Sequence, residues 1–203
     1  MKRCIVIVPG LEPTDDSYFG IINRMNSLLG VEEGRSWTVD LQDYFRKKCN
    51  ADVYIFDYTI RIPTKKAVKE ASRQLSEYLN SLNSKYPIIL FGKSLGGTIV
   101  SECLDRLGDS KNKIEKAVYI ATPHRTAGPQ KSIPSINIYS TNDYYARLAN
   151  VLLHRTLKQQ IENSKNIGLP GLRHSDFNHD REIVYSGKRR QLFEVYQEVI
   201  ERM

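Results

Sequence analysis

The chain has 203 residues and a formal net charge of +7, with 30 Lys and Arg residues against 23 Asp and Glu residues. Its 40% hydrophobic and 26% charged residues exclude a disordered or collagen-like chain. No apolar run approaches the ~20 residues that a membrane-spanning helix needs. At roughly 100–200 residues per domain, the length predicts a single domain over residues 1–203.

Short apolar runs alternate with helical patterns along the whole chain. The runs are rich in β-branched residues and do not alternate polar with apolar positions, which is typical of strands buried on both faces. In chain order the predicted elements are strand Cys4–Val8, helices Tyr18–Leu29 and Thr38–Lys48, strand Asp52–Phe56, helix Thr64–Asn83, strand Ile88–Phe91, helix Leu95–Leu107, strands Ala117–Ala121 and Ser135–Tyr139, helix Tyr144–Leu157, strand Asn166–Leu169 and helix Lys188–Arg202.

This alternation predicts the fold class. Strands separated by helices form βαβ units, whose right-handed crossovers place helices on both faces of a parallel sheet. We therefore expect a three-layer α/β/α fold with a mostly parallel sheet of about six strands. Ligands of such sheets bind beyond the carboxyl ends of the strands, so the loops after the strands are where functional residues are expected.

The three cysteines, Cys4, Cys49 and Cys103, form no close pair in the sequence, and two of them lie inside apolar patterns. This indicates reduced core residues of a cytoplasmic protein. Lys2 and Arg3 precede an apolar run, as in a signal peptide, but the run is too short and ends at Pro9-Gly10 without a cleavage site.

Basic residues cluster at several separate places rather than in one stripe. The clusters are Arg46–Lys48, Lys65-Lys66, Lys111–Lys116 and Lys188–Arg190. Their scatter favours solvated helix faces, and no nucleic-acid-binding motif accompanies them, so we expect no specific nucleic-acid partner. Peripheral contact with an anionic surface is left open.

The predicted third strand is followed by Gly92-Lys93-Ser94-Leu95-Gly96, a G-x-S-x-G motif between a strand and a helix. A nucleophilic serine needs a sharp turn that exposes its Oγ, and the glycines allow strand and helix to approach closely. The helix that begins at Leu95 adds unpaired N–H groups and a positive dipole end. In this context the motif predicts a nucleophile at Ser94.

A serine nucleophile needs a general base and an acid that orients the base. His174 follows the last predicted strand, and Asp143 follows strand Ser135–Tyr139, so the chain order is Ser, Asp, His. We favour His174 and Asp143 as base and acid. His179 and Asp176 are the alternatives that the sequence leaves open.

With these residues, the chain resembles the α/β-hydrolase superfamily, and within it the small lipase- or esterase-like members. The resemblance covers nearly the whole chain. Four segments carry it: Val6–Leu11 as first core strand and oxyanion loop, Gly92–Gly96 as nucleophile elbow, Ala121–Arg125 as the T-P-H segment of many lipases, and Gly171–Ser175 as the catalytic-histidine loop.

The resemblance implies a sheet order of 2-1-3-4-5-6, since the antiparallel hairpin that often opens the fold is missing. It implies an oxyanion hole formed by the backbone N–H groups of Leu11 and Leu95, although Pro9-Gly10 replaces the family's usual His-Gly. The short segment Thr122–Pro134 leaves no room for a lid. The residues expected to line the substrate site are Gly10, Lys93, His124 and Tyr58.

The expected activity is hydrolysis of a carboxylic ester, through a Ser-His-Asp triad and an acyl-enzyme, on a small acyl ester or a lipid. A thioesterase or amidase would use the same triad, and a non-catalytic binding protein on the same fold is the alternative from another class. His174, Asp176 and His179 are dense enough to suggest a metal, but no matched pair of ligands accompanies them. We expect no metal and no cofactor.

Overall fold

The computed structural model describes residues 2–10, 37–60, 64–107, 113–123, 133–154 and 159–202. Within them lies a six-stranded parallel sheet of order β2-β1-β3-β4-β5-β6. The strands are β1 (Arg3–Val8), β2 (Ala51–Ile55), β3 (Ile88–Lys93), β4 (Ile114–Ile120), β5 (Ser135–Tyr139) and β6 (Lys165–Gly168). The predicted sheet and its strand order are confirmed.

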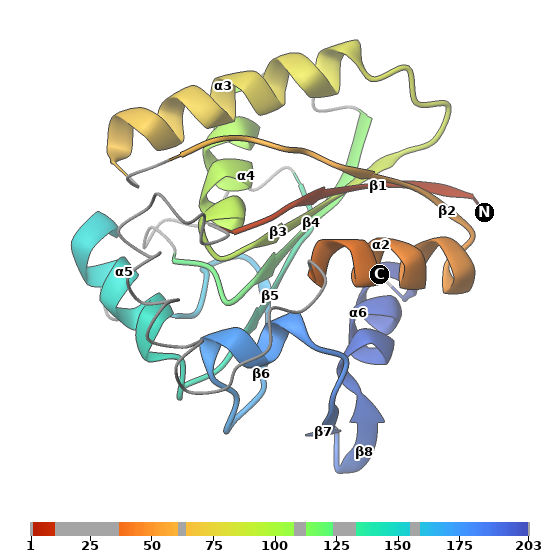
Figure 1. Cartoon of the computed structure of the whole chain (residues 1–203), viewed down its shortest axis with the longest axis vertical. Helices are drawn as coiled ribbons and strands as arrows, with labels where there is room; N and C mark the ends of the chain where they lie inside the picture. The colour runs from red at the N-terminus through yellow and green to blue at the C-terminus, as the bar shows by residue number, and fades with distance from the viewer. Residues whose placement is uncertain are drawn as a thin grey trace, which may run out of the picture.

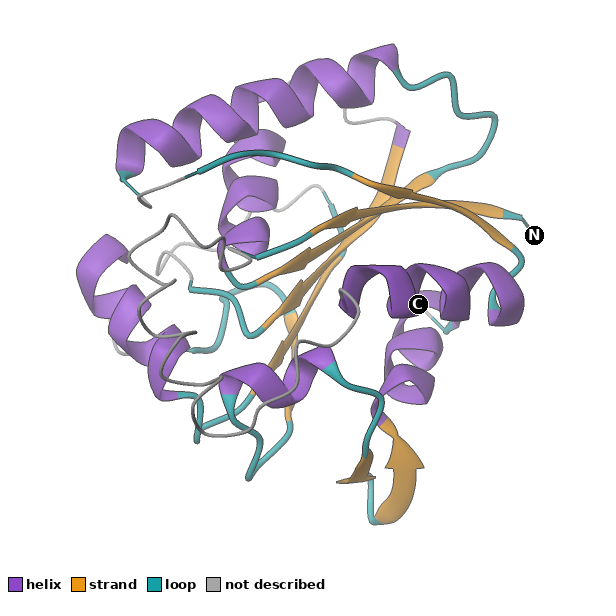
Figure 2. Ribbon diagram, viewed as in Figure 1, coloured by secondary structure: helices purple, strands orange, loops and turns teal. Residues whose placement is uncertain are grey.

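Helices cover both faces of this sheet, which confirms the three-layer architecture (Figures 1 and 2). On one face lie α2 (Trp37–Lys48) and α6 (Leu192–Glu201), and on the other lie α3 (Lys65–Ser81) and α4 (Leu95–Arg106). Helix α5 (Tyr144–His154) follows β5. The predicted helix Tyr18–Leu29 falls outside the described residues. No helix in the described part of the chain is both long and apolar enough to span a bilayer.

Strand β1 shows why the apolar runs predicted two-sided burial. Cys4, Val6 and Val8 pack into the core beneath α3 and α4. Ile5 and Ile7 point the other way, into the core beneath α2 and α6. Since successive side chains of a strand leave opposite faces, a central strand needs apolar residues at every position.

Helix α3 follows from the spacing of its apolar residues. Thr64 caps its first turn, where the side-chain oxygen accepts a hydrogen bond from the Ala67 N–H at 3.2 Å. Val68, Leu75 and Leu79 then face the core at helical spacing. This element lies within two residues of each predicted end.

The predicted helix Lys188–Arg202 is wrong over its first four residues. Lys188–Gln191 form strand β8, which pairs antiparallel with β7 (Glu182–Tyr185). Ser186 and Gly187 make the connection with positive φ angles of 51° and 74°, the combination that a two-residue hairpin turn requires. Residues 188–191 contain no apolar residue, so helical periodicity was never present in them. Helix α6 begins only at Leu192.

Acidic neighbours pair with the basic side chains of this hairpin. Arg189 lies 3.1 Å from Glu182, and Arg190 forms ion pairs with Glu194 and Glu198. These pairs connect β8 to β7 and to α6. The two arginines therefore join neighbouring elements, as expected of a solvated ionic surface.

Lys116 of β4 is 1% exposed, although lysine is rarely buried. Its ammonium donates a hydrogen bond to the backbone carbonyl of Ile200, 2.9 Å away, near the carboxyl end of α6. The negative end of the helix dipole favours a cation there. Burial nevertheless lowers the pKa of Lys116 below 10.5, and Glu115 opposes this shift.

We predict that the stability of the wild type relative to Lys116→Met rises with pH between neutrality and about 10.5. The folded pKa lies below the unfolded one, so the unfolded chain binds more protons in this range, and the free energy of unfolding increases with pH. Denaturant titrations of both proteins at several pH values measure this difference, in which other titrating groups cancel. A constant or falling difference would contradict the prediction.

Candidate active site

Ser94 lies at the sharp turn between β3 and α4, with φ 51° and ψ −126°. This is a left-handed conformation that costs a non-glycine residue about 1–3 kcal/mol and persists only where the surroundings hold it. Its backbone N–H donates to the Ile120 carbonyl at 2.8 Å, which holds the turn against the end of β4. The side chain is half-buried and faces the carboxyl ends of the strands.

Three glycines around Ser94 permit backbone contacts that no other residue allows. A Cβ at Gly96 would lie 2.1 Å from the Val8 carbonyl oxygen, and one at Gly92 would lie 2.6 Å from the Gly97 Cα. A Cβ at Gly97 would lie 2.0 Å from the side-chain oxygen of Thr122. The spacing of the motif is therefore a steric requirement of the turn.

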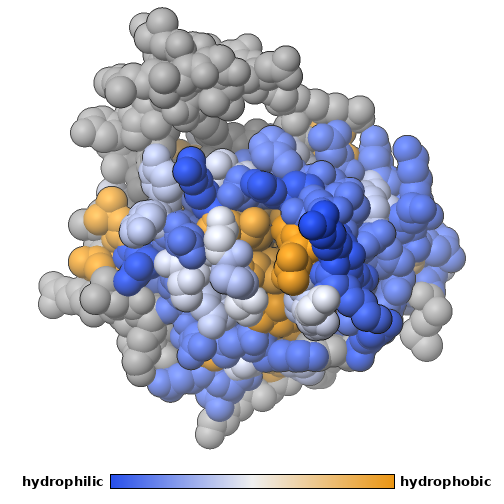
Figure 3. Space-filling model, turned by 90° about the horizontal axis from the view of Figure 1, so that it is seen from below, coloured by the Kyte–Doolittle hydropathy of each residue, from blue (hydrophilic) through white to orange (hydrophobic). Residues whose placement is uncertain are grey.

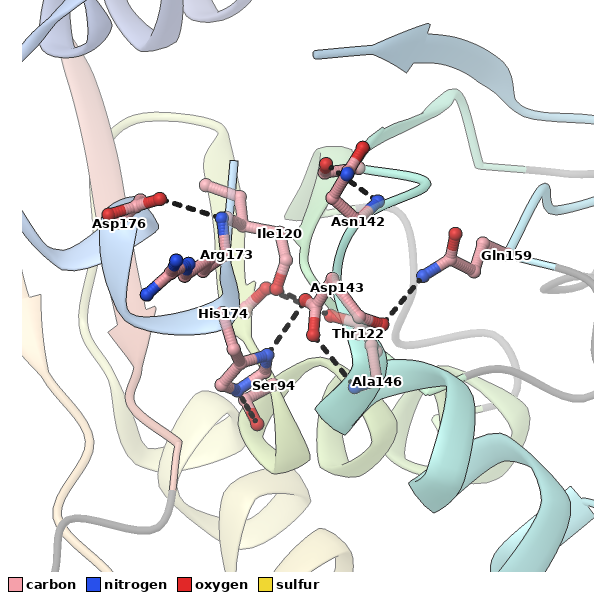
Figure 4. Close-up of polar contacts among 12 residues, drawn as sticks. Ser94, Ile120, Thr122, Asn142, Asp143, Ala146, Gln159, Arg173, His174 and Asp176 are labelled. Carbon is pink, nitrogen blue, oxygen red and sulfur yellow. Dashed lines mark hydrogen bonds and ion pairs between the residues drawn. The ribbon is translucent and has the colours of Figure 1, made fainter. Parts of the chain in front are cut away.

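His174 bridges Ser94 and Asp143 (Figure 4). Its Nε2 is 2.9 Å from the Ser94 Oγ, and its Nδ1 is 2.8 Å from the Asp143 Oδ2. A carboxylate only accepts hydrogen bonds, so Nδ1 donates to Asp143 and Nε2 is left to accept from the serine hydroxyl. These three predicted side chains thus form one hydrogen-bonded chain from three separate loops.

Asp143 is fully buried and is held from two directions. Its Oδ1 accepts from the Ala146 N–H at 2.9 Å, so the side chain also caps the first turn of α5. Its backbone carbonyl accepts from the Gln159 side chain at 3.2 Å. The carboxylate consequently has one orientation, with Oδ2 directed at His174.

The alternative base and acid lie elsewhere. Asp176 accepts from the Arg173 N–H at 2.7 Å and forms an ion pair with Arg181. Both contacts stabilise the short 3-10 helix His174–Asn178 from its outer side. His179 is exposed and follows that helix. The geometry therefore favours His174 over His179 and Asp143 over Asp176.

Two polar side chains to which the sequence analysis gave no role of their own connect the loops. The Asn142 Oδ1 accepts from the Gly171 N–H at 3.2 Å, which joins the loop of Asp143 to the loop of His174. Thr122 donates to the carbonyl oxygens of the Ile120 and Gly92 residues, at 3.1 and 3.4 Å. Asn142 could have been suspected from its place beside Asp143, but nothing in the sequence indicates its partner.

The segment after β1 approaches Ser94 directly. A Cβ at Gly10 would lie 3.0 Å from the Ser94 Cβ and 3.6 Å from its Oγ, so only glycine leaves the hydroxyl open on this side. The Tyr58 hydroxyl donates to the Pro9 carbonyl at 2.8 Å. The structure thus places Tyr58 against the backbone of this loop.

The other predicted site residues have different surroundings. Lys93 is 5% exposed, and its ammonium lies 5.4 Å from the centre of the Trp37 ring on the α2 side of the sheet. Leu95 is the first residue of α4, where backbone N–H groups have no partner within the helix. Leu11 and His124 lie outside the described residues.

The cysteines offer no competing nucleophile. All three are buried and form no disulfide. Burial raises the pKa of Cys49 to about 11 and that of Cys103 to about 12, so neither is a thiolate near neutral pH. Among the described residues, no group of three or more His, Cys, Asp or Glu side chains is arranged to hold a metal ion.

Solved structures with this architecture include several hydrolases. The chain superposes on Est1E from Butyrivibrio proteoclasticus with a TM-score of 0.55 at 12% identity, covering 98% of this chain and 85% of that one. A Xanthomonas campestris member of the α/β serine hydrolases without a lid gives 0.51 at 13% identity, over 84% and 72% of the two chains. A lipase-esterase related protein from Clostridium acetobutylicum gives 0.50 at 13% identity, over 82% and 84%.

The chain has the α/β-hydrolase fold. No protein-family model matches the sequence, and curated proteins give no significant match. At 12–13% identity the structural likeness concerns the fold alone. The reaction must therefore be argued from the residues around Ser94.

We predict that Gly96→Ala destabilises the protein by about 3 kcal/mol. The new methyl group would overlap backbone atoms, which cannot move away as the end of a flexible side chain can. Gly168→Ala is the matched control, since a Cβ there lies no closer than 3.5 Å to the Tyr139 side chain. Thermal or denaturant unfolding compares the two variants. Equal stabilities would show that α4 does not need its close approach to β1.

Proposed function

We propose that the protein is a serine hydrolase that cleaves carboxylic esters. The observation that carries the proposal is the hydrogen-bonded chain of Ser94, His174 and Asp143, at 2.9 and 2.8 Å, on a strained strand-to-helix turn. A serine with only a packing role would need neither a backbone with positive φ nor a hydrogen bond to a histidine held by a buried carboxylate. The α/β-hydrolase fold supports the same reaction class by analogy.

Acylation begins when the Ser94 Oγ attacks the carbonyl carbon of the ester, while His174 Nε2 accepts the hydroxyl proton. Asp143 keeps the imidazole in the required tautomer and stabilises the imidazolium. As the tetrahedral intermediate collapses, the bond to the alcohol oxygen breaks and His174 returns the proton to the leaving alcohol. Water then attacks the acyl-serine with His174 as base again, and the carboxylic acid is released.

The negative charge of each tetrahedral intermediate needs donors that are already in place. The N–H of Leu95, at the positive end of α4, supplies one of them in this proposal, and the N–H of Leu11 supplies the other. Gly10 leaves the space beside the Ser94 hydroxyl open because it carries no side chain. The ester bond is the simplest substrate of this machinery, and a thioester or an amide would use the same steps.

Ser94→Ala and His174→Ala are each expected to lower kcat for p-nitrophenyl esters at least ~10³-fold, because the members of a triad act as a unit. The matched control His179→Ala replaces the exposed alternative histidine and should keep most of the activity. Near-normal turnover by a folded Ser94→Ala protein would contradict the proposal.

The same assay separates the two candidate acids. Asp143→Asn should be as damaging as the loss of the base, since its amide no longer fixes the tautomer, whereas Asp176→Asn affects only the outer side of the histidine loop. A fluorophosphonate probe adds a direct readout, because it labels an activated serine covalently. A folded wild type that is not labelled would favour a binding protein on this fold.

Tyr58 acts in this proposal as a positioning residue for the oxyanion loop. Its hydroxyl holds the Pro9 carbonyl, and this bond fixes the peptide that leads to Gly10 and Leu11. We expect Tyr58→Phe to lower kcat about tenfold with KM nearly unchanged, because the loop contacts the oxyanion and not the resting ester. Steady-state kinetics measure kcat and KM separately. A change in KM alone would contradict this role and indicate that Tyr58 contacts the substrate instead.

A further inference from the structure

Helix α5 presents large apolar side chains to solvent. Tyr144 is 71% exposed, Tyr145 57%, Leu148 58% and Val151 42%. In the part of the chain that the structure describes, these are four of the six large apolar residues that are exposed. Tyr144, Leu148 and Val151 follow the i, i+4, i+7 spacing of one helix face, so the exposure forms a continuous stripe. We call this stripe, together with Tyr145, the α5 face.

The buried residues of α5 strengthen the argument that the exposed stripe is an interaction site. Among the described side chains of residues 144–151, Ala146 and Asn150 are buried, at 3% and 0% exposure. Over these residues, packing alone would bury Leu148 and the two tyrosines and expose Ala146 and Asn150. The pattern is reversed here, and a contiguous apolar surface of this kind marks an interaction site.

The α5 face adjoins the candidate active site. Asp143 caps the helix, and the ring of Tyr145 lies 5.9 Å from that of His174. Figure 1 shows α5 beside the carboxyl ends of the central strands. Seen from below, the surface is mainly hydrophilic, with apolar residues gathered in the middle and on the left flank (Figure 3).

The charges of helix α5 indicate which kind of partner could bind the α5 face. Helix α5 contains one arginine, Arg147, and no acidic residue, in a chain of net charge +7. The Arg147 guanidinium donates to the carbonyl oxygen of Thr141, an uncharged acceptor, at 3.5 Å. A helix with an arginine, no acidic residue, and exposed tyrosine, leucine and valine, on a chain of positive net charge, fits an anionic, partly apolar surface.

We propose that the α5 face docks the protein on an anionic lipid surface, with Leu148 and Val151 in the acyl boundary and the tyrosines at the level of the headgroups. A second copy of the chain is a poorer occupant, because four side chains of one helix fall short of the ~800 Å² per partner that a stable dimer buries. Two copies of charge +7 also repel each other.

Docking in this orientation would hold the edge of the sheet that carries Ser94 close to the lipid. Ser94 itself is half-buried. The docking itself does not depend on the proposed function; only its use, the presentation of lipid esters to Ser94, rests on that proposal.

Vesicle sedimentation with the Ser94→Ala protein tests the docking without any turnover. We expect binding to phosphatidylglycerol vesicles, much weaker binding to phosphatidylcholine vesicles, and a loss of binding as salt screens the charges. Leu148→Ser combined with Val151→Ser should weaken binding at least tenfold. Val184→Ser is the matched control, since Val184 is exposed to 66% on the distant hairpin.

Equal binding to both vesicle types, no binding to either, or an equal loss with Val184→Ser would overturn the proposal. A dimer in light scattering that dissociates in the Leu148→Ser, Val151→Ser variant would also overturn it, because a second copy would then cover the face. The same double substitution in the wild-type background should leave hydrolysis of monomeric p-nitrophenyl acetate unchanged. Vesicle binding without ester hydrolysis would reject the proposed function and leave the docking surface standing.

Discussion

The close approach of α4 to β1 at Gly96 sets the geometry of the whole site. A Cβ there would lie 2.1 Å from the Val8 carbonyl oxygen, so helix and strand meet backbone to backbone. This contact places the positive end of α4 directly behind Ser94 and brings Gly10 beside the hydroxyl. Ser94, the loop after β1 and the positive end of α4 converge because no side chain separates them. The left-handed conformation of Ser94, at φ 51°, is held within this arrangement.

The six strands and the general position of Ser94 could be predicted because both follow from local patterns. A central strand of a parallel sheet is apolar at every position, as Cys4–Val8 is, and such a run has few other interpretations. The glycines of the G-x-S-x-G motif are a steric requirement of the turn between strand and helix, so the motif can be recognised directly in the sequence. Asp143 and His174 were predicted by the weaker rule that ligand-binding residues follow the strands of a parallel sheet, and that rule left Asp176 and His179 open.

What could not be predicted depends on contacts between distant segments. No periodicity reveals that Asn142 accepts from Gly171 or that Tyr58 reaches the Pro9 carbonyl, because these partners lie 29 and 49 residues apart. The hairpin at Ser186-Gly187 was missed for a different reason. Strand β8 contains three charged residues and no apolar one, and its arginines form ion pairs with Glu182 and Glu198 instead of packing in the core.

Helix α5 orients Asp143 and also exposes an apolar face, and different residues of the helix serve these two purposes. Its first turn must orient Asp143, which the capping bond to the Ala146 N–H does without using any apolar side chain. Among its described side chains, Ala146 and Asn150 are buried while Leu148 and Val151 are exposed, so Leu148 and Val151 do not anchor the helix. Apolar area left exposed in this way contributes nothing to folding and favours association. A partner bound to the α5 face would lie next to His174, because the ring of Tyr145 is 5.9 Å from the ring of His174.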